Sequence, residues 1–192
     1  MEHLSRVDPK LGAVIERTGP CTLKTRGDCF ISLCRAIISQ QISGVVAVAI
    51  TKRFKKLFPR SRPTPKHLLT LSDEQLRSAG LSRQKMSYLK DLAAHFAEGK
   101  VPVRRFSRMS DEEIIQSLIP VKGIGRWTAE MFLIFVLNRP DLLPVDDLGV
   151  RKGFQKVYGL KSEPKAAKMI KIAEKWRPWR TVGSWYMWRG MD

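Results

Sequence analysis

The stretch LIPVKGIGRWTAEMFLIFVLNRPDLLPVDDLGVR, residues 118–151, decides the fold. A glycine hairpin at 121–125 joins two apolar segments with helical spacing, and a loop containing proline then leads to two adjacent aspartates where a further helix is expected. Short glycine turns bring two helix ends together and let another chain approach the backbone closely. The stretch therefore predicts a helical domain with a binding loop at its hairpin.

Helix start and stop signals recur along the whole chain. Ser72 with Gln75, and Ser110 with Glu113, match the capping box, in which a cap hydroxyl and the third helical residue bond reciprocally. Strand-like alternation never exceeds four or five residues, so we predict an all-α fold of about ten helices without a sheet. The expected helices include 8–17, 28–41, 44–58, 73–79, 83–98, 111–119, 126–138, 147–158 and 164–176, with a Pro-rich loop at 59–65.

Composition favours a soluble intracellular protein. The chain has 192 residues, 43% of them apolar, which is enough for one domain or two closely packed lobes. Its longest apolar runs, 44–50 and 131–137, are far shorter than the roughly 18 residues that span a bilayer. The first ten residues contain no apolar core of a signal peptide.

The positive net charge of the chain indicates a polyanionic partner. Lys and Arg number 35 against 18 Asp and Glu, for a net charge of +17. A folded domain this basic usually meets a polyanion, most often nucleic acid, although a well-solvated basic surface remains an alternative. An anionic membrane is disfavoured because the basic residues are not gathered on one amphipathic helix.

Cysteine and histidine usage indicates no required metal or cofactor. The cysteines are odd in number and form no C-x-x-C pair, which argues against a disulfide framework, a zinc site or an iron–sulfur cluster. The histidines lie far apart and match no metal motif. These residues are Cys21, Cys29, Cys34, His3, His67 and His95.

The hairpin has the features of a phosphate clamp. Gly123 and Gly125 permit positive φ, and the unpaired N–H groups of the following helix favour an anion, as do Lys122 and Arg126. Such contacts hold DNA without reading its bases. A dinucleotide-binding loop is disfavoured because Thr128 replaces its third glycine and no strand precedes it. A plain turn that needs glycine only for packing remains open.

The paired aspartates, Asp146 and Asp147, allow one carboxylate to cap the next helix and the other to serve another purpose. A helix N-terminus favours the ionised carboxylate. Beside a phosphate clamp, such an anion could stabilise positive charge on a deoxyribose as its base leaves, and could orient water.

Several motifs resemble one family. VKGIGRWTAEMFLIF at 121–135 and LPVDDLGVRKG at 143–153 are similar to the helix-hairpin-helix (HhH-GPD) DNA glycosylase superfamily, with its Gly/Pro-rich loop and catalytic Asp. The segments ISLCRAIISQQIS, AGLSRQKMSYLKDLA and WRPWRTVGSWYMWR resemble its 3-methyladenine DNA glycosylase II branch. The motifs occur in family order over about 28–190, in the compact form without the N-terminal β-rich domain of longer members.

The resemblance implies a two-lobed fold with a cleft between the lobes. One lobe would cover about 43–143, with the hairpin at 118–131, and the other would combine the N-terminal helices with about 147–192. The implied activity is base excision repair by a monofunctional glycosylase, which hydrolyses the N-glycosidic bond of alkylated bases, such as 3-methyladenine and 7-methylguanine, flipped out of double-stranded DNA. The implied location is the nucleoid of a bacterium or archaeon, or the nucleus of a eukaryote, and the implied state is a monomer.

The resemblance also assigns roles by position. Asp147 matches the catalytic acid, and Asp146 is expected to cap the helix or support its neighbour. Trp127 stands where bifunctional relatives place a lysine nucleophile, so AP-lyase activity by that route is not expected. Lys85 or Lys152 could still react weakly if either lies near the cleft.

The remaining candidate residues fall into three groups. The base pocket is expected from Trp127, Met131, Trp185, Tyr186 and Trp188, although the family often has Tyr at position 131. DNA binding is expected from Gln40, Gln41, Ile42 and Ser43, with Gln41 filling the gap left by the flipped base, and from Lys122, Gly123, Gly125, Arg126 and Thr128. A monovalent cation, Na⁺ or K⁺, is expected on the backbone carbonyls of Ile119, Val121 and Ile124.

Three alternatives remain open from the sequence. The chain could be a helix-hairpin-helix module that binds DNA or damage without catalysis. It could be a glycosylase for another damaged base. It could also be a helical protein–protein module unrelated to DNA.

Overall fold

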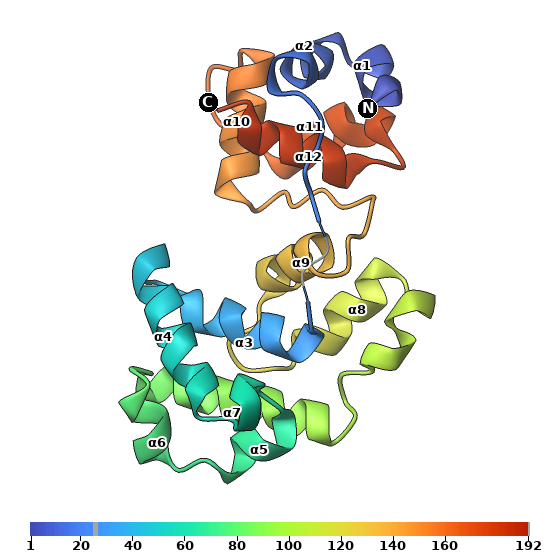
Figure 1. Ribbon diagram of the computed structural model, residues 1–192. Coiled ribbons are helices and arrows are strands. Elements are labelled where there is room, and N and C mark those ends of the chain that lie inside the picture. The colour runs from blue at the N-terminus through green and yellow to red at the C-terminus, as the bar shows by residue number, and fades with distance from the viewer. Residues whose placement is uncertain (25–26, 192) are drawn as a thin grey trace. The chain divides into compact units, whose positions relative to one another are not determined.

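The computed structural model describes residues 1–24 and 27–191, and every regular element in them is helical, as predicted (Figure 1). Three short 3-10 segments, η1 (Pro59–Ser61), η2 (Val103–Arg108) and η3 (Glu174–Trp176), accompany the α-helices. The α-helices are α1 (Glu2–Val7), α2 (Pro9–Thr18), α3 (Cys29–Ser39), α4 (Gly44–Lys56), α5 (Pro65–Thr70), α6 (Asp73–Ser78), α7 (Arg83–Ala97), α8 (Asp111–Leu118), α9 (Arg126–Phe135), α10 (Leu148–Tyr158), α11 (Ala166–Ala173) and α12 (Arg180–Arg189). In the described part of the chain, every helix is too short or too polar to cross a lipid bilayer.

Local sequence signals account for most helix ends. Both predicted capping boxes form, at the starts of α6 and α8. The predicted helices did not include α1, α5 or α12, and α5 begins where the Pro-rich loop was expected to end. Thr64 caps α5 by accepting a hydrogen bond from the amide of His67, and Pro65 occupies its first position, where a missing N–H costs nothing.

The contacts divide the chain into two compact units. Unit 1 consists of Met1–Thr25 and Leu133–Asp192, and unit 2 of Arg26–Phe132. Unit 2 includes α3, whereas the sequence placed the start of the hairpin lobe near residue 43. The helix belongs there because its apolar face packs on α4 and α7, with Phe30 edge-on to Phe96 at 5.1 Å between ring centres.

Unit 1 is built on the close packing of α10 and α12. A Cβ atom at Gly153 would lie 2.1 Å from the carbonyl oxygen of Met187, so only glycine permits this approach. The buried Asp8 accepts hydrogen bonds from the indole Nε1 of Trp176, at 2.9 Å, and from the Tyr158 hydroxyl, and it also caps α2. These bonds fasten the N-terminal helices to the C-terminal ones.

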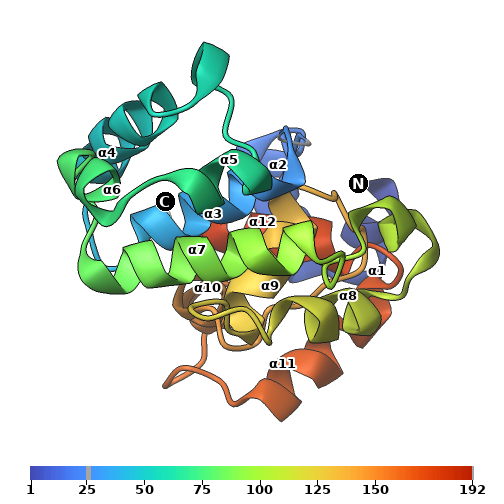
Figure 2. The same cartoon turned by 90° about the horizontal axis from the view of Figure 1, so that it is seen from below.

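Unit 2 is organised around α7, its longest helix. Figure 2 shows α7 beside α3, α5 and α6, and all three pairs are in contact. Leu89, Leu92 and Ala93 of α7 are fully buried and form much of the unit's core. The helix that fills this core also supports the hairpin described below.

Candidate functional site

Asp147 is the N-cap of α10 and is held by two donors. Its Oδ1 accepts a hydrogen bond from the amide of Val150 at 2.8 Å and another from the indole Nε1 of Trp188 at 2.7 Å. The side chain is nearly buried, with 8% of its residue surface exposed. The two donors and the positive end of the α10 dipole stabilise a negative charge at this position.

The expectation that Asp146 caps the helix is wrong. The first helical residue is Leu148, so the residue directly before it, Asp147, provides the cap, and Asp146 is exposed. One carboxylate, that of Asp147, therefore occupies both the N-cap of α10 and the position at which the catalytic acid is predicted.

Trp188 is placed by two residues for which the sequence predicted no role. Its ring stacks on Phe135, with ring centres 5.5 Å apart and planes inclined by 25°. A Cβ at Gly149 would lie 2.7 Å from Cδ1 of Trp188 and 3.1 Å from Oδ1 of Asp147. A glycine in the first turn of a helix, where it costs stability, was the available signal for this close approach.

The other two C-terminal candidates for the base pocket belong to the core of unit 1. Tyr186 is fully buried, and its hydroxyl donates a hydrogen bond to the carbonyl of Gly19 at 2.8 Å. Trp185 is also buried, edge-on to Tyr186, with the guanidinium of Arg189 over its ring. The pocket role predicted for Tyr186 is therefore wrong, because its ring and hydroxyl are both used in packing.

The hairpin depends on Gly123. Its φ is +81°, and a Cβ there would lie 2.2 Å from the ring of Tyr88 on α7, so both conformation and space require glycine. Its carbonyl accepts a hydrogen bond from Nε2 of Gln40 at 2.8 Å. Gly125 does not adopt the positive φ that glycine permits. Its carbonyl accepts the first hydrogen bond of α9, from the amide of Ala129.

The two basic hairpin side chains have acidic partners. The amide of Lys122 donates to Oδ2 of Asp91 at 2.8 Å, and its ammonium lies 3.9 Å from Oδ1. The guanidinium of Arg126 makes two hydrogen bonds to Glu112, at 2.6 and 3.1 Å. The sequence did not identify these partners, and they offset part of the positive charge that it predicted for the phosphate clamp.

The turn between α3 and α4 separates the two glutamines. Gln40 is half-buried and bonded to the hairpin, whereas Gln41 is exposed and has φ +56°, an uncommon conformation for a residue with a side chain. Ile42 is half-buried, and Ser43 occupies the N-cap of α4 without a side-chain cap bond. Of the four residues, Gln41 is the one whose conformation is specialised while its side chain remains exposed.

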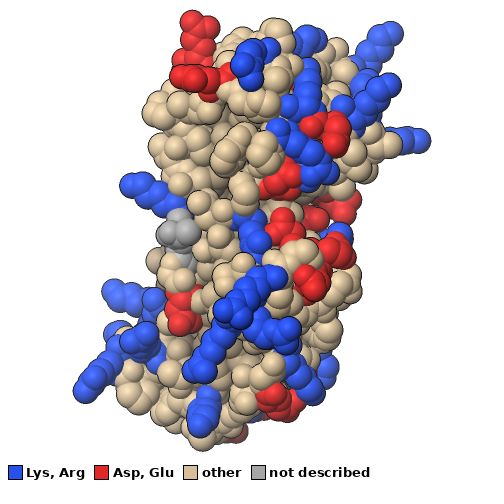
Figure 3. Space-filling model, turned by 90° about the vertical axis from the view of Figure 1, so that its right-hand side faces the viewer, with Lys and Arg blue, Asp and Glu red and all other residues tan. Residues whose placement is uncertain are grey.

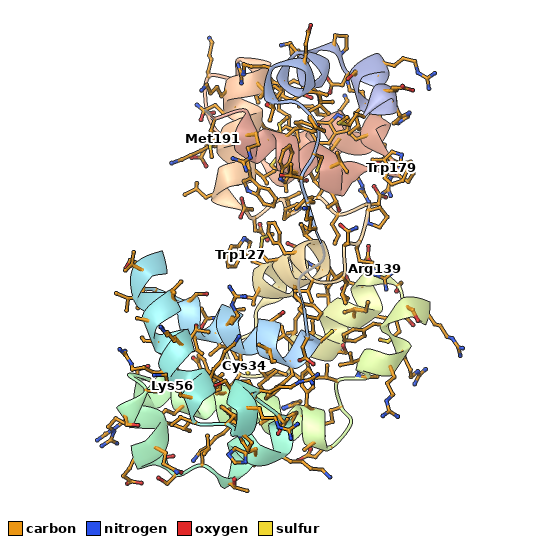
Figure 4. The ribbon with its side chains drawn as sticks, in the orientation of Figure 1. Cys34, Lys56, Trp127, Arg139, Trp179 and Met191 are labelled. Carbon is orange, nitrogen blue, oxygen red and sulfur yellow. The ribbon has the colours of Figure 1, made fainter. Side chains whose placement is uncertain are left out.

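The start of α9 carries the other pocket candidates. Trp127 projects from its first turn and is 47% exposed (Figure 4), and Met131, one turn later on the same face, is half-buried. Thr128 is buried, so its contribution to DNA binding would come from its backbone. Trp127 and Met131 belong to unit 2, and Trp188 to unit 1, so their grouping in one base pocket stays a prediction.

Side-chain metal ligands do not gather anywhere in residues 1–24 and 27–191, where His, Cys, Asp and Glu form no cluster of three or more. At the hairpin, the carbonyl of Val121 accepts a hydrogen bond from the amide of Ile124 at 3.0 Å, and a carbonyl oxygen with two lone pairs can accept more. The monovalent cation expected on the carbonyls of Ile119, Val121 and Ile124 stays a prediction.

Lys85 and Lys152 are the two lysines that could act as weak nucleophiles if either lay near the cleft. The ammonium of Lys85 donates to the carbonyl of Ile38 at 2.7 Å, and burial lowers its pKa. Lys152 is exposed on α10. The Lys85 side chain thus supports the end of α3.

A helical chain with a glycine hairpin before one helix and a buried, hydrogen-bonded aspartate at the start of another has the architecture of helix-hairpin-helix DNA-repair proteins. The family model described as "HhH-GPD superfamily base excision DNA repair protein" matches residues 34–178. The chain belongs to this superfamily, which confirms the resemblance found in its sequence.

Several relatives that match nearly the whole chain are named as 3-methyladenine DNA glycosylases. The chain is 36% identical to DNA-3-methyladenine glycosylase 1 of Schizosaccharomyces pombe, over 97% of this chain and 84% of the relative. It superposes with a TM-score of 0.84 on the structure of a 3-methyladenine DNA glycosylase from S. pombe in complex with abasic DNA, at 36% identity, covering 97% and 93% of the two chains. A DNA-3-methyladenine glycosidase from Bacillus halodurans gives a TM-score of 0.90 at 33% identity, covering 98% and 87%.

Proposed function

We propose that this chain is a monofunctional DNA glycosylase that removes alkylated bases, of the 3-methyladenine and 7-methylguanine type, from double-stranded DNA in base excision repair. The observation that carries the proposal is Asp147, a buried carboxylate at a helix N-terminus held by Val150 and Trp188. Relatives named as 3-methyladenine glycosylases, and one solved with abasic DNA, support the substrate class. The protein would act wherever its DNA lies, in a nucleoid or a nucleus.

The reaction needs a stabilised sugar cation more than a strong acid. Alkylation at N3 or N7 gives the base a positive charge, so it leaves with the electron pair of the C1′–N bond and needs no proton from the protein. Asp147 stabilises the positive charge that grows on the deoxyribose, and a water oxygen then bonds to C1′ and releases its proton. The product is an abasic site with both DNA strands intact.

Strand cleavage by the enzyme is not part of this proposal. Trp127 cannot form a Schiff base, and the Lys85 ammonium is hydrogen-bonded to a backbone carbonyl. The carbonyls of Ile119, Val121 and Ile124 would hold Na⁺ or K⁺, whose charge would favour a phosphate at the hairpin. No other cofactor is proposed.

The test is single-turnover base release from duplexes containing 7-methylguanine, 3-methyladenine, 1,N6-ethenoadenine or hypoxanthine. Asp147→Asn removes the charge and keeps a side chain that caps helices well, so the fold should survive while release falls by at least about 100-fold. Glu16→Gln is the control, because it removes one negative charge from an exposed residue of unit 1 that has no role in the proposed site. Release in wild type and control, with strand breaks only after alkali, is the expected result.

A different outcome would favour a rival. If wild type binds the damaged duplexes but releases no base from any of them, the chain is a damage-binding module. If it releases hypoxanthine or ethenoadenine but neither methylated base, it is a glycosylase of another specificity. Equal activity of Asp147→Asn and wild type would remove Asp147 from the mechanism.

A further inference from the structure

A basic pocket lies beside the hairpin in unit 2. Its volume is about 480 Å³, and its cationic lining comes from three elements: Arg77 of α6, Arg83 and Lys90 of α7, and Lys122 of the hairpin, with Ser87 between the α7 residues. The sequence predicted no role for the residues from α6 and α7. A concave surface with this lining has the charge that a phosphate group needs and ample room for one.

The pocket also contains two carboxylates, and they are already engaged. Asp73 pairs with Lys90 at 2.5 Å, and Asp91 accepts the hydrogen bond from the amide of Lys122. Arg77 and Arg83 form no ion pair with any residue in 1–24 or 27–191. Asp73 and Glu74 interact electrostatically with Arg77 and offset part of its charge, but neither guanidinium is held in an ion pair, so both can turn toward a ligand.

The turn that carries these arginines is held firmly. Gly80 has φ +92°, and Nε of Arg53 donates to the carbonyl of Ala79 at 2.9 Å. Ser82 then caps α7 by accepting from the amide of Lys85. Because Arg77 and Arg83 flank this turn, their backbones are fixed before any ligand binds, and a guanidinium can donate two parallel hydrogen bonds to a phosphate.

The hairpin alone lacks this free charge, because Arg126 is bound to Glu112. Figure 3 shows the same mixture of signs more widely, with Asp and Glu among the Lys and Arg side chains of one face. We propose that the pocket lined by Arg77 and Arg83 binds a second DNA backbone phosphate, beside the one at the hairpin. The inference rests on the proposed DNA substrate and adds a binding site that positions the duplex.

The test is the salt dependence of binding to undamaged duplex DNA, measured by fluorescence anisotropy. Arg77→Ala with Arg83→Ala should weaken binding and make the slope of log K against log salt shallower by about 0.9, the value for one phosphate contact. The matched control is Arg104→Ala with Arg105→Ala, two exposed arginines of η2 (Val103–Arg108) in the same unit. Its slope should equal that of wild type, and circular dichroism melting checks that both variants fold.

Two results would overturn the proposal: a pocket variant with the slope and affinity of wild type, or equal losses in both double variants, which would mean that only net charge matters. Failure of the proposed function is read separately, as base release. A protein that binds DNA through the pocket yet releases no base would uphold the site and contradict the glycosylase. A protein that releases base, but whose pocket variant binds DNA as wild type does, would uphold the glycosylase and contradict the site.

Discussion

The indole Nε1 of Trp188 donates a hydrogen bond of 2.7 Å to Oδ1 of Asp147, across 41 positions of sequence. This bond exists because α12 approaches α10 closely, at Gly153, and because Gly149 leaves space for the indole. Trp188 therefore acts first as a positioning residue for the carboxylate, whatever its ring contributes to a base pocket.

We expect Trp188→Phe to slow base release by about 10- to 100-fold. Phenylalanine keeps a ring against Phe135 but removes the N–H donor, and hydrogen bonds to charged groups contribute about 1.5–3 kcal/mol. Single-turnover release under enzyme excess measures the effect without a contribution from product release.

Trp179→Phe is the matched control, since Trp179 is exposed at the start of α12 (Figure 4) and loses the same N–H group. Its rate should stay within about twofold of wild type. Equal rates for Trp188→Phe and Trp179→Phe would show that the bond to Asp147 does not assist the reaction.

Gly149→Ala tests the contact between Trp188 and Asp147 by a substitution on α10. Helix propensity alone favours alanine by about 1 kcal/mol, yet its Cβ would lie 2.7 Å from the Trp188 ring. We expect base release to fall, while binding to undamaged DNA is unchanged because the hairpin lies in unit 2. An alanine variant as active as wild type would mean that the indole can move without disturbing Asp147.

The sequence predicted features that depend on residues a few positions apart. It missed features that depend on contacts between residues far apart in the chain. The capping boxes at Ser72 and Ser110 formed as expected, because both partners lie within one helical turn. The sequence also predicted a helix over 147–158, and α10 begins one residue later, after Asp147 as its N-cap. Nothing in local periodicity showed that Trp188 would reach that acid.

The same limit applies to the hairpin. Its glycines were recognised, but Gln40 lies 83 positions from Gly123 and was expected at the DNA instead. Tyr88 and Asp91, which hold the hairpin from α7, lie in the motif AGLSRQKMSYLKDLA, but the resemblance assigned no role to either residue. The sequence could place charges at 122 and 126, whereas only the fold could bring acids beside them.

Lowering the pH should destabilise the folded protein, in part because the carboxylate of Asp8 becomes protonated. Burial raises the pKa of this carboxyl, but hydrogen bonds from Tyr158, Trp176, the Leu11 amide and Lys175 outweigh burial, so its pKa lies below the usual 3.8. A depressed pKa contributes stability that is present above 3.8 and is lost as pH falls through the lower, folded-state value.

Urea unfolding between pH 7 and pH 2.5 measures this contribution. Asp8→Asn should be less stable than wild type at pH 7, by about 1–3 kcal/mol, with the difference shrinking below pH 3.8. Asp146→Asn, an exposed carboxylate in the same unit, serves as the control for the loss of one charge. If the free energies of unfolding of Asp8→Asn and wild type differed by the same amount from pH 7 to pH 2.5, the lowered pKa of Asp8 would be contradicted.

Substitutions at Gln41 test the role of its side chain and the strain of its backbone separately. Its side chain is proposed to fill the gap in the duplex, and its φ of +56° costs roughly 1 kcal/mol for any residue except glycine. Gln41→Ala and Gln41→Gly both remove the side chain, but only glycine relieves the strain. We expect equal losses of base release in the two variants, with the glycine variant more resistant to urea than the alanine variant by up to about 1 kcal/mol. Equal stability would mean that the turn adapts to alanine, and release at the wild-type rate in both would assign the gap-filling role to a residue other than Gln41.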